Sequence, residues 1–361
     1  MEYLLVTGGA GFIGSNFVRY LLATEADVHI VNLDLLTYAG SLENLSELPD
    51  RNRHTFIKGD ICDQELVAKL LREYHISKVV HLAAETHVDR SVHGPAEFIQ
   101  TNVVGTFTLL EAVKDYWLNE KPFSESDIRF HHVSTDEVYG TLGPNDPPFT
   151  ETTPYAPNSP YSASKAASDH LVRAYHATYG LPISITNCSN NYGPHQFPEK
   201  LIPLMILNAN NGKELPIYGD GNQIRDWLYV EDHCEAIWRI VQSGEPGETY
   251  NVGGHNQPTN LTVVKTICEI LDECTPSSPY IPHDTLIRHV TDRPGHDRRY
   301  DVDISKIKQT LAWQPKESLT TGLLRTVEWY LNNPDWIQAI HKRGGYQIWM
   351  QQNYTDRGSI E

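Results

Sequence analysis

Three residues that can exchange protons with a substrate stand together at Thr135, Asp136 and Glu137. Residues 128 to 133 predict a buried strand, which places this hydroxyl and these carboxylates at its carboxyl end, where open α/β sheets bind ligands. Adjacent side chains at a strand end point in different directions, so the two carboxylates can reach different atoms of one substrate. Taken alone, the segment is better explained as a turn in which Ser, Thr and Asp bond to the backbone, and only the Tyr and Lys further along the chain favour an active site.

A second candidate pair follows at Tyr161 and Lys165, whose i, i+4 spacing places both on one face of a helix. A lysine ammonium near a tyrosine hydroxyl favours the phenolate and lowers the tyrosine pKa from its reference of about 10. Elsewhere this spacing is typical of a solvated helix face. Because the pair comes one helix after Thr135 and behind a dinucleotide-type loop, we interpret it as the catalytic pair of a hydride-transfer enzyme.

The elements that must position these residues begin with an apolar strand at residues 3 to 6, followed by Gly8-x-x-Gly11-x-x-Gly14 and a helical apolar pattern. Such glycines let the backbone approach a pyrophosphate at the helix N-terminus. Asp34, 20 residues after Gly14, ends the next strand, where a carboxylate accepts both ribose hydroxyls. No Arg directly follows Asp34 to hold a 2′-phosphate, which favours NAD over NADP. The alternative is an ordinary βα turn.

Strands and helices continue to alternate along the first half of the chain. Strands at 54–58, 78–82 and 183–188, and helices at 64–74 and 95–117, predict an α/β fold with a Rossmann-type doubly wound parallel sheet. Asp60, at a strand end, is open to two interpretations, a bond to an adenine amino group or a cap on the following helix. We expect an NAD-binding domain at 1–190 and a smaller, mixed, nucleotide-sugar-binding domain at 191–361, with about 225–255 packing back on the first.

Composition limits the class of protein. The chain has 361 residues, 40% hydrophobic and 21% charged, and lacks an apolar run of the roughly 20 residues that a membrane span needs. A formal charge of −17 argues against a nucleic-acid surface. The five cysteines show no zinc-type spacing, so we expect reduced core thiols and no metal site. The N-terminus runs directly into the first strand, so we expect no cleavable signal and a cytoplasmic location.

The glycine loop and the Tyr161-x-x-x-Lys165 pair resemble the extended short-chain dehydrogenase/reductase family. The chain is similar in more detail to the dTDP-glucose 4,6-dehydratase family. The shared segments include 34–40, 81–85, 87–91, 134–140, 187–194, 197–203, 223–227, 253–256, 292–297 and 352–354. Thr86 is a departure, since the family more often has Ser there, and we expect the extra methyl group to be tolerated.

The resemblance implies a set of binding residues. The cofactor would be NAD, held by Gly8, Gly11, Phe12, Ile13, Gly14, Asp34, Leu35, Thr37, Asp60, Ile61, Leu82, Ala83, Ala84, Thr101, Tyr161, Lys165 and Asn191. The nucleotide-sugar substrate would contact Thr86, His87, Thr135, Asn190, Lys200, Leu201, Pro216, Ile217, Tyr218, Arg225, Asn260, Arg293, His296 and Tyr354. By residue type alone, Lys200, Arg225, Arg293 and His296 are better explained as surface charges.

The resemblance also implies a mechanism. Tyr161 would deprotonate the sugar 4-hydroxyl while hydride passes from C4 to NAD, and Thr135 would bond to the 4-keto oxygen. Glu137 would remove the C5 hydrogen, and a protonated Asp136 would protonate the departing 6-hydroxyl. Hydride would return to C6, giving a 4-keto-6-deoxy sugar, a precursor of rhamnose-type deoxysugars.

Two other functions remain open at this point. A nucleotide-sugar 4-epimerase, or another nucleotide-sugar dehydratase, would share the loop, the tyrosine and the lysine, although an epimerase has no need of Asp136 and Glu137. A non-catalytic NAD-dependent sensor would keep the fold without needing either pair. We also expect a homodimer, because the helices at 101–117 and 161–179 carry apolar residues beyond one face and could pair with their copies in a four-helix interface.

Overall fold

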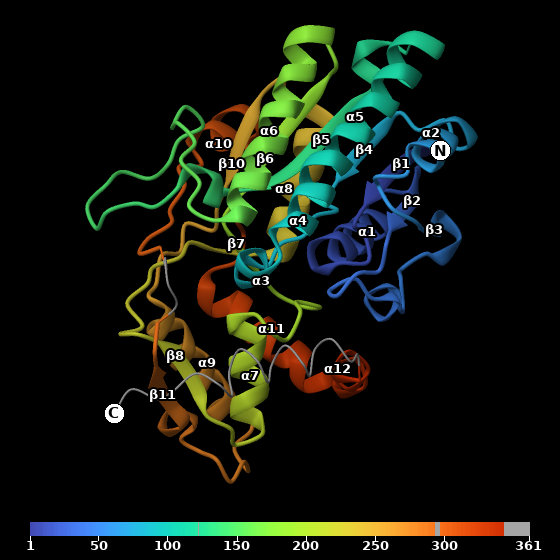
Figure 1. Ribbon diagram of the computed structural model, residues 1–361. Helices are drawn as coiled ribbons and strands as arrows, with labels where there is room; N and C mark the ends of the chain where they lie inside the picture. Colours follow the sequence, from blue (N-terminus) through green and yellow to red (C-terminus); the bar gives the residue numbers. More distant parts are fainter. Residues whose placement is uncertain (122, 293–296, 343–361) are drawn as a thin grey trace.

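The computed structural model describes residues 1–121, 123–292 and 297–342 and contains a seven-stranded sheet (Figure 1). Its strand order is β3-β2-β1-β4-β5-β6-β10, and all of its pairings are parallel. The bounds are Glu2–Thr7 (β1), Val28–Asp34 (β2), His54–Lys58 (β3), Lys78–His81 (β4), Arg129–Thr135 (β5), Ile183–Cys188 (β6) and Thr249–Val252 (β10). The order of the first six strands is that of a doubly wound dinucleotide-binding sheet, so the predicted fold class is confirmed.

Helices cover both faces of this sheet because successive side chains of each buried strand point to opposite faces. Leu4 packs with the helices of one face and Leu5 with those of the other. The first face carries α1 (Phe12–Thr24) and α8 (Val230–Ser243). The second carries α2 (Gln64–Glu73), α5 (Thr106–Lys114) and α6 (Pro160–Tyr179). The α10 helix (Ser305–Leu311) packs near β10.

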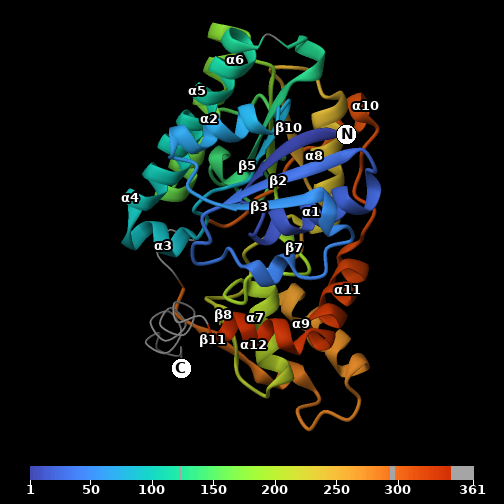
Figure 2. The same cartoon turned by 90° about the vertical axis from the view of Figure 1, so that its right-hand side faces the viewer.

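The second half of the chain forms a smaller helical part below the sheet in the view of Figure 1, and Figure 2 shows the same division from the side. Its core joins α7 (Leu201–Asn210), α9 (Asn260–Cys274), α11 (Leu319–Asn332) and α12 (Pro334–His341). Two short parallel pairs complete it, β7 (Asn190–Tyr192) with β9 (Trp227–Tyr229), and β8 (Leu215–Tyr218) with β11 (Ile287–Val290). Residues between 225 and 255 return to the large sheet, where α8 packs on one face and β10 is the last strand.

The helix expected at 95–117 is a run of successive helical segments. It contains α4 (Pro95–Phe98), a π-helical turn at Ile99–Gly105, α5, and a second π-helical segment at Asp115–Glu120, after a separate α3 (Val88–His93). The run lies beside α6 (Figure 1). Several of its large apolar side chains are exposed, including Phe107 at 46% and Val104 at 37%.

The cysteines are all free, but only Cys188, Cys234 and Cys268 are buried. Cys274 is exposed at the end of α9 and is not among the buried residues of that helix. The expectation of core thiols is therefore wrong for Cys274. Within the described ranges, no helix is both long enough and apolar enough to cross a membrane.

Candidate active site

A cavity of about 300 Å³ opens where the carboxyl ends of β1, β2, β4, β5 and β6 meet the smaller part of the chain. Every residue predicted to bind the cofactor lines it, as do the residues predicted to be catalytic. Of the residues predicted for the substrate, Thr86, Thr135, Asn190 and Lys200 also line it. The structure therefore brings the predicted cofactor-binding and catalytic residues, with four of the predicted substrate-binding residues, to one site.

The glycine loop forms one wall of the cavity. Gly8 has φ +73°, and a Cβ atom there would lie 2.6 Å from the Ala83 backbone, so only glycine fits. The α1 helix begins at Phe12 without a side-chain cap on its first amides. These N–H groups are available to an anion, and the helix dipole favours negative charge at this end. The loop has the shape and the charge that a pyrophosphate requires.

Asp34 stands at the end of β2 with its carboxylate held by two backbone amides. Ala10 donates to Oδ2 at 2.9 Å and Leu36 donates to Oδ1 at 2.7 Å. A carboxylate can accept about four hydrogen bonds, so capacity remains for ribose hydroxyls at this side of the cavity. The residues present therefore fit a dinucleotide.

Asp60 does not cap the following helix, so that interpretation is wrong. The α2 N-cap is Asp63, which accepts from the Leu66 amide at 3.0 Å, while Asp60 accepts from the Cys62 amide at 2.8 Å and lines the cavity. Five residues, 59–63, separate the end of β3 from the start of α2, which places Asp63 rather than Asp60 beside the free amides.

The acidic pair follows directly on β5. Thr135 is the N-cap of a short 3₁₀ turn at Asp136–Tyr139, so its Oγ1 accepts from the Glu137 amide at 3.3 Å and lies 3.4 Å from Asp136 Oδ1. Asp136 is only 2% exposed. Burial, then the neighbouring Glu137 and Asp226 charges, raise the pKa of Asp136 well above its usual value. Asp136 is held as a neutral acid, whereas Glu137 is more exposed.

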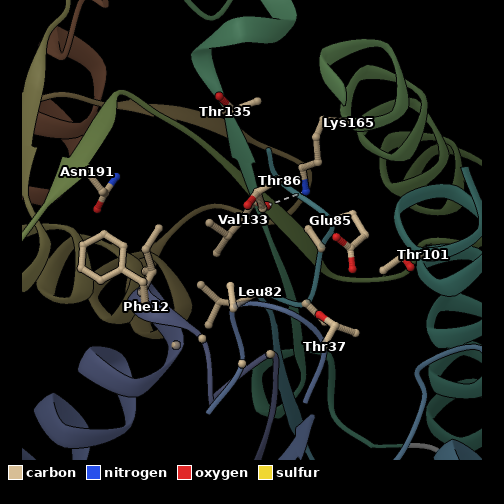
Figure 3. A pocket seen from close by; sticks show the side chains of 18 of the residues that line it. Phe12, Thr37, Leu82, Glu85, Thr86, Thr101, Val133, Thr135, Lys165 and Asn191 are labelled. Carbon is tan, nitrogen blue, oxygen red and sulfur yellow. Dashed lines mark hydrogen bonds between the residues drawn. The ribbon is translucent and has the colours of Figure 1, made fainter. Parts of the chain in front are cut away.

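The α6 helix carries Tyr161 and Lys165 into the site. A capping box at Ser159 and a proline at Pro160 fix where this helix begins, one residue before Tyr161. Lys165 donates to the Val133 carbonyl oxygen at 2.9 Å, as the dashed line in Figure 3 shows. The i, i+4 pair thus faces the carboxyl end of β5.

The prediction that Lys165 lowers the pKa of Tyr161 is wrong for the protein without a bound cofactor or substrate. Burial, followed by Glu137 and Cys188, raises the pKa of Tyr161 well above its usual value. The physical reason is that the phenolate would be desolvated beside a carboxylate, while the Lys165 ammonium is directed at Val133. Further positive charge at the site is needed to favour the phenolate.

Known proteins resemble this chain in both sequence and fold. A family model described as GDP-mannose 4,6 dehydratase matches residues 5–326. A dTDP-glucose 4,6-dehydratase of Salmonella typhimurium is 55% identical over 362 aligned residues, covering 98% of this chain and 99% of the relative. The chain belongs to the dTDP-glucose 4,6-dehydratase family.

Two solved structures extend the comparison of this dehydratase-family chain. A Bacillus anthracis dTDP-glucose 4,6-dehydratase in complex with NAD superposes with TM-score 0.83 at 46% identity, covering 94% of this chain and 100% of that one. A Thermotoga maritima UDP-glucose 4-epimerase with UDP-glucose gives TM-score 0.80 at 30% identity, covering 92% and 99%. The fold is thus shared with epimerases, and the chemistry must be argued from the site.

The remaining residues predicted for the substrate do not line the cavity, or they lie outside the described residues. His87 is the N-cap of α3, and its Nε2 is 3.5 Å from Glu199. Leu201 starts α7, and Pro216, Ile217 and Tyr218 belong to β8, of which Ile217 is fully buried. Asn260 starts α9, with its Oδ1 buried and without a partner among the described residues. Arg293, His296 and Tyr354 lie outside the described residues.

Arg225 is not a surface charge, so that alternative is wrong for it. The side chain is 5% exposed, and its guanidinium lies 4.6 Å from the Tyr300 ring centroid. It donates to the backbone oxygens of Ile224 and Asp297, both at 2.8 Å. It does not line the cavity, but its partner Asp297 lies directly next to the segment that holds Arg293 and His296.

Sequence reasoning missed several residues that line the cavity. Glu85 lines the cavity four residues after β4 ends, as Asp136 lines it directly after β5. Tyr38 and Phe197 also line the site and meet edge to face, with their ring centroids 5.8 Å apart. Glu85 was detectable as a carboxyl at a strand end, whereas the aromatic contact joins distant segments and leaves no local signal.

Proposed function

We propose that the chain dehydrates dTDP-glucose to dTDP-4-keto-6-deoxyglucose, with NAD as a tightly bound cofactor. The observation that carries this proposal is the shared cavity, in which Asp136 and Glu137 lie with Tyr161 and Lys165 behind the glycine loop. Hydride transfer uses the tyrosine and lysine, whereas loss of water needs an acid and a base in addition. Both sets are present in one place.

Each side chain has a role that fits its position. Tyr161 takes the proton of the 4-hydroxyl, and Thr135 donates to the 4-keto oxygen. Glu137, the more accessible carboxylate, removes the C5 proton, and the neutral acid Asp136 gives its proton to the leaving 6-hydroxyl. NAD, when bound in this cavity, would supply a hydride acceptor and donor and the positive charge of its nicotinamide.

The nucleotide part of the substrate is assigned to the smaller part of the chain. The positions of Lys200 at the cavity wall, Asn260 at the start of α9 and buried Arg225, which donates to the Asp297 backbone oxygen, support a diphosphate site there. The β8 residues 216 to 218 are assigned to the base. We retain as part of the proposal a cofactor domain at 1–190 and a nucleotide-sugar domain at 191–361, with residues at about 225–255 packing back on the first domain.

A 4-epimerase is the second candidate, favoured only by the likeness to the Thermotoga structure. Epimerisation removes and returns a hydride at C4 without losing water, so it leaves the burial of a protonated Asp136 unexplained. The acidic pair at the cavity therefore favours dehydration over epimerisation.

The deciding experiment incubates the purified protein with dTDP-glucose and follows the product by mass spectrometry. Dehydration lowers the substrate mass by one water, whereas epimerisation leaves it unchanged and gives dTDP-galactose on chromatography. GDP-mannose in a parallel reaction tests the other nucleotide-sugar dehydratase activity. No water loss from dTDP-glucose would overturn the proposal.

The proposal includes a homodimer in the cytoplasm. Phe107, Val104 and Ile99 are exposed on the helical run beside α6, and a second copy would cover them. All five cysteines are unpaired, which suits a reducing compartment.

A further inference from the structure

A group of buried polar side chains surrounds Lys165, and it has no role in the steps above. Asp169 lies one helical turn after Lys165 on α6 and is 0% exposed. Its Oδ2 accepts from Ser134 Oγ at 2.9 Å and from Tyr155 Oη at 2.8 Å. Its Oδ1 lies 3.2 Å from His132 Nε2. A carboxylate buried this deeply is costly unless donors and opposite charge stabilise it.

Lys165 approaches the same nitrogen of the His132 ring. Its Nζ is 3.4 Å from His132 Nε2 and 2.9 Å from the Val133 oxygen. One ring nitrogen cannot donate to Asp169 and accept from Lys165 at the same time. The Val133 bond gives the ammonium one acceptor, whereas Asp169 Oδ1 has no other donor among the described residues, so the ring proton on Nε2 is best used toward Asp169. The Lys165 ammonium and the Asp169 carboxylate then both lie next to Nε2 of a neutral His132 ring.

The electrostatics of the three groups agree with this arrangement. Burial lowers the pKa of Lys165 to about 8, and Asp169 acts in the opposite direction. Burial opposes ionisation of Asp169, but His132, Lys165 and Ser134 outweigh it and lower its pKa. Burial and Lys165 lower the pKa of His132 to about 4. At neutral pH the cluster holds an ammonium, a carboxylate and a neutral imidazole.

We propose that Asp169 is a positioning residue for the proposed reaction, whose buried carboxylate, acting across His132, keeps Lys165 charged and held against the Val133 carbonyl. The inference rests on the proposed function for the role of Lys165. Without the Asp169 charge, Lys165 would lose its proton more readily, and Tyr161 would lose a nearby cation.

Other groups face this cluster from each neighbouring element. These are His81 on β4, Asp136 after β5, Cys188 on β6, and Tyr161 and Arg173 on α6. The pKa of His81 is lowered well below its usual value by burial and by His132 and Lys165, so His81 is neutral. Asp136 is held as a neutral acid. Asp169 is therefore the ionised carboxylate of the described residues that lies nearest to Lys165 in this cluster.

The test measures the titration of Lys165 directly. Trace acetylation with acetic anhydride at a series of pH values, read by mass spectrometry of the Lys165 peptide, reports the fraction of neutral amine. In Asp169→Asn we expect the midpoint to fall by about one to two pH units, the shift typical of a lost opposite charge nearby. Tyr155→Phe is the matched control, because it removes one bond to Asp169 and leaves the charge, so its midpoint should match the wild type.

Asp169→Ser, which leaves room for water, is the second variant in case Asp169→Asn does not fold, and the same fall is expected. An unchanged midpoint in a folded variant overturns the proposal. The labelling needs no substrate, so it decides this inference even if dTDP-glucose is not turned over. With turnover, the alkaline limb of the pH profile should move toward neutral pH in Asp169→Asn and stay in place in Tyr155→Phe, an effect that a purely structural role would not produce.

Discussion

Thr135 Oγ1 lies 3.4 Å from Asp136 Oδ1, while Asp136 Oδ2 is buried without a hydrogen-bond partner in the part of the chain that the structure describes. An ionised carboxylate with one orphan oxygen in such a place is costly. The neutral acid is therefore the stable form, and the hydroxyl beside it lies where the 4-keto oxygen is proposed to bind. The two residues together place a proton donor and a ketone ligand one residue apart.

Asp136→Asn should slow dehydration by about 10² to 10⁴ because the amide matches the neutral acid in size but transfers no proton. Oxidation at C4 should survive, seen as near-ultraviolet absorbance of reduced cofactor when dTDP-glucose is added. The raised pKa means that the wild-type carboxyl destabilises the folded state as pH rises above the unfolded pKa, so the variant should melt no lower at neutral pH. Product formation at the wild-type rate would exclude Asp136 as the acid.

Glu137→Gln should reduce dehydration by a similar factor of about 10² to 10⁴, because the C5 proton loses its base. Exchange of the C5 hydrogen with deuterated water, read by mass spectrometry, should fall with it. Tyr161→Phe is the comparison, since it should suppress the reduced-cofactor signal that Glu137→Gln retains. Normal C5 exchange in Glu137→Gln would assign the base elsewhere.

Arg225→Ala should weaken binding of dTDP-glucose by about 2 to 4 kcal/mol, the cost of removing one partner of a buried charged contact. Calorimetry with NAD-loaded protein measures it, and NAD content should hardly change because Arg225 does not line the cofactor cavity. Arg298→Ala is the matched control, since that side chain is 51% exposed and pairs with Asp220 at the surface. Equal affinity in both variants would leave Arg225 a purely structural role.

How far the sequence predicts this molecule depends on whether the signal is local. The glycine loop, Asp34 and the i, i+4 pair are fixed by spacing within single elements, and all of them line the cavity. Arg225 could not be placed, because its burial depends on Tyr300, a residue far along the chain.

The same limit applies to Lys165. Its helical register is readable from the sequence, but its hydrogen bond to Val133 joins α6 to β5. The direction of the Tyr161 pKa was therefore mispredicted from local spacing, since it depends on burial and on carboxylates brought in by the fold.

Phe107→Asp should convert a dimer to a monomer, because a charge would replace a ring that is 46% exposed on the helical run beside α6. Light scattering at micromolar concentration measures the mass. Leu324→Asp on α11 is the control, with a side chain 38% exposed on the other part of the molecule, and its mass should not change. A wild-type monomer with full activity would contradict the dimer itself.

Glu85 should make stability depend on pH. Its side chain is in the cavity wall, and Asn102 holds its backbone through bonds of 2.9 Å and 3.0 Å. Burial, then Glu97, raises the pKa of Glu85 to about 7. Because the folded state holds this proton more tightly, the stabilisation is complete below the unfolded pKa of about 4.3 and is lost as pH rises through about 7. The total change is roughly 4 kcal/mol at most, at about 1.36 kcal/mol per pKa unit.

Glu85→Gln removes this titration. In denaturant unfolding at constant NAD, the variant should match the wild type in unfolding free energy near pH 4 and exceed it by up to roughly 4 kcal/mol near pH 8. Glu97→Gln is the control, because its exposed charge is the second cause of the shift and its removal should recover only a small part of the difference. The unfolding free energies of Glu85→Gln and the wild type could instead differ by the same amount at every pH from 4 to 8. That result would show that Glu85 ionises in the folded protein as freely as in the unfolded chain.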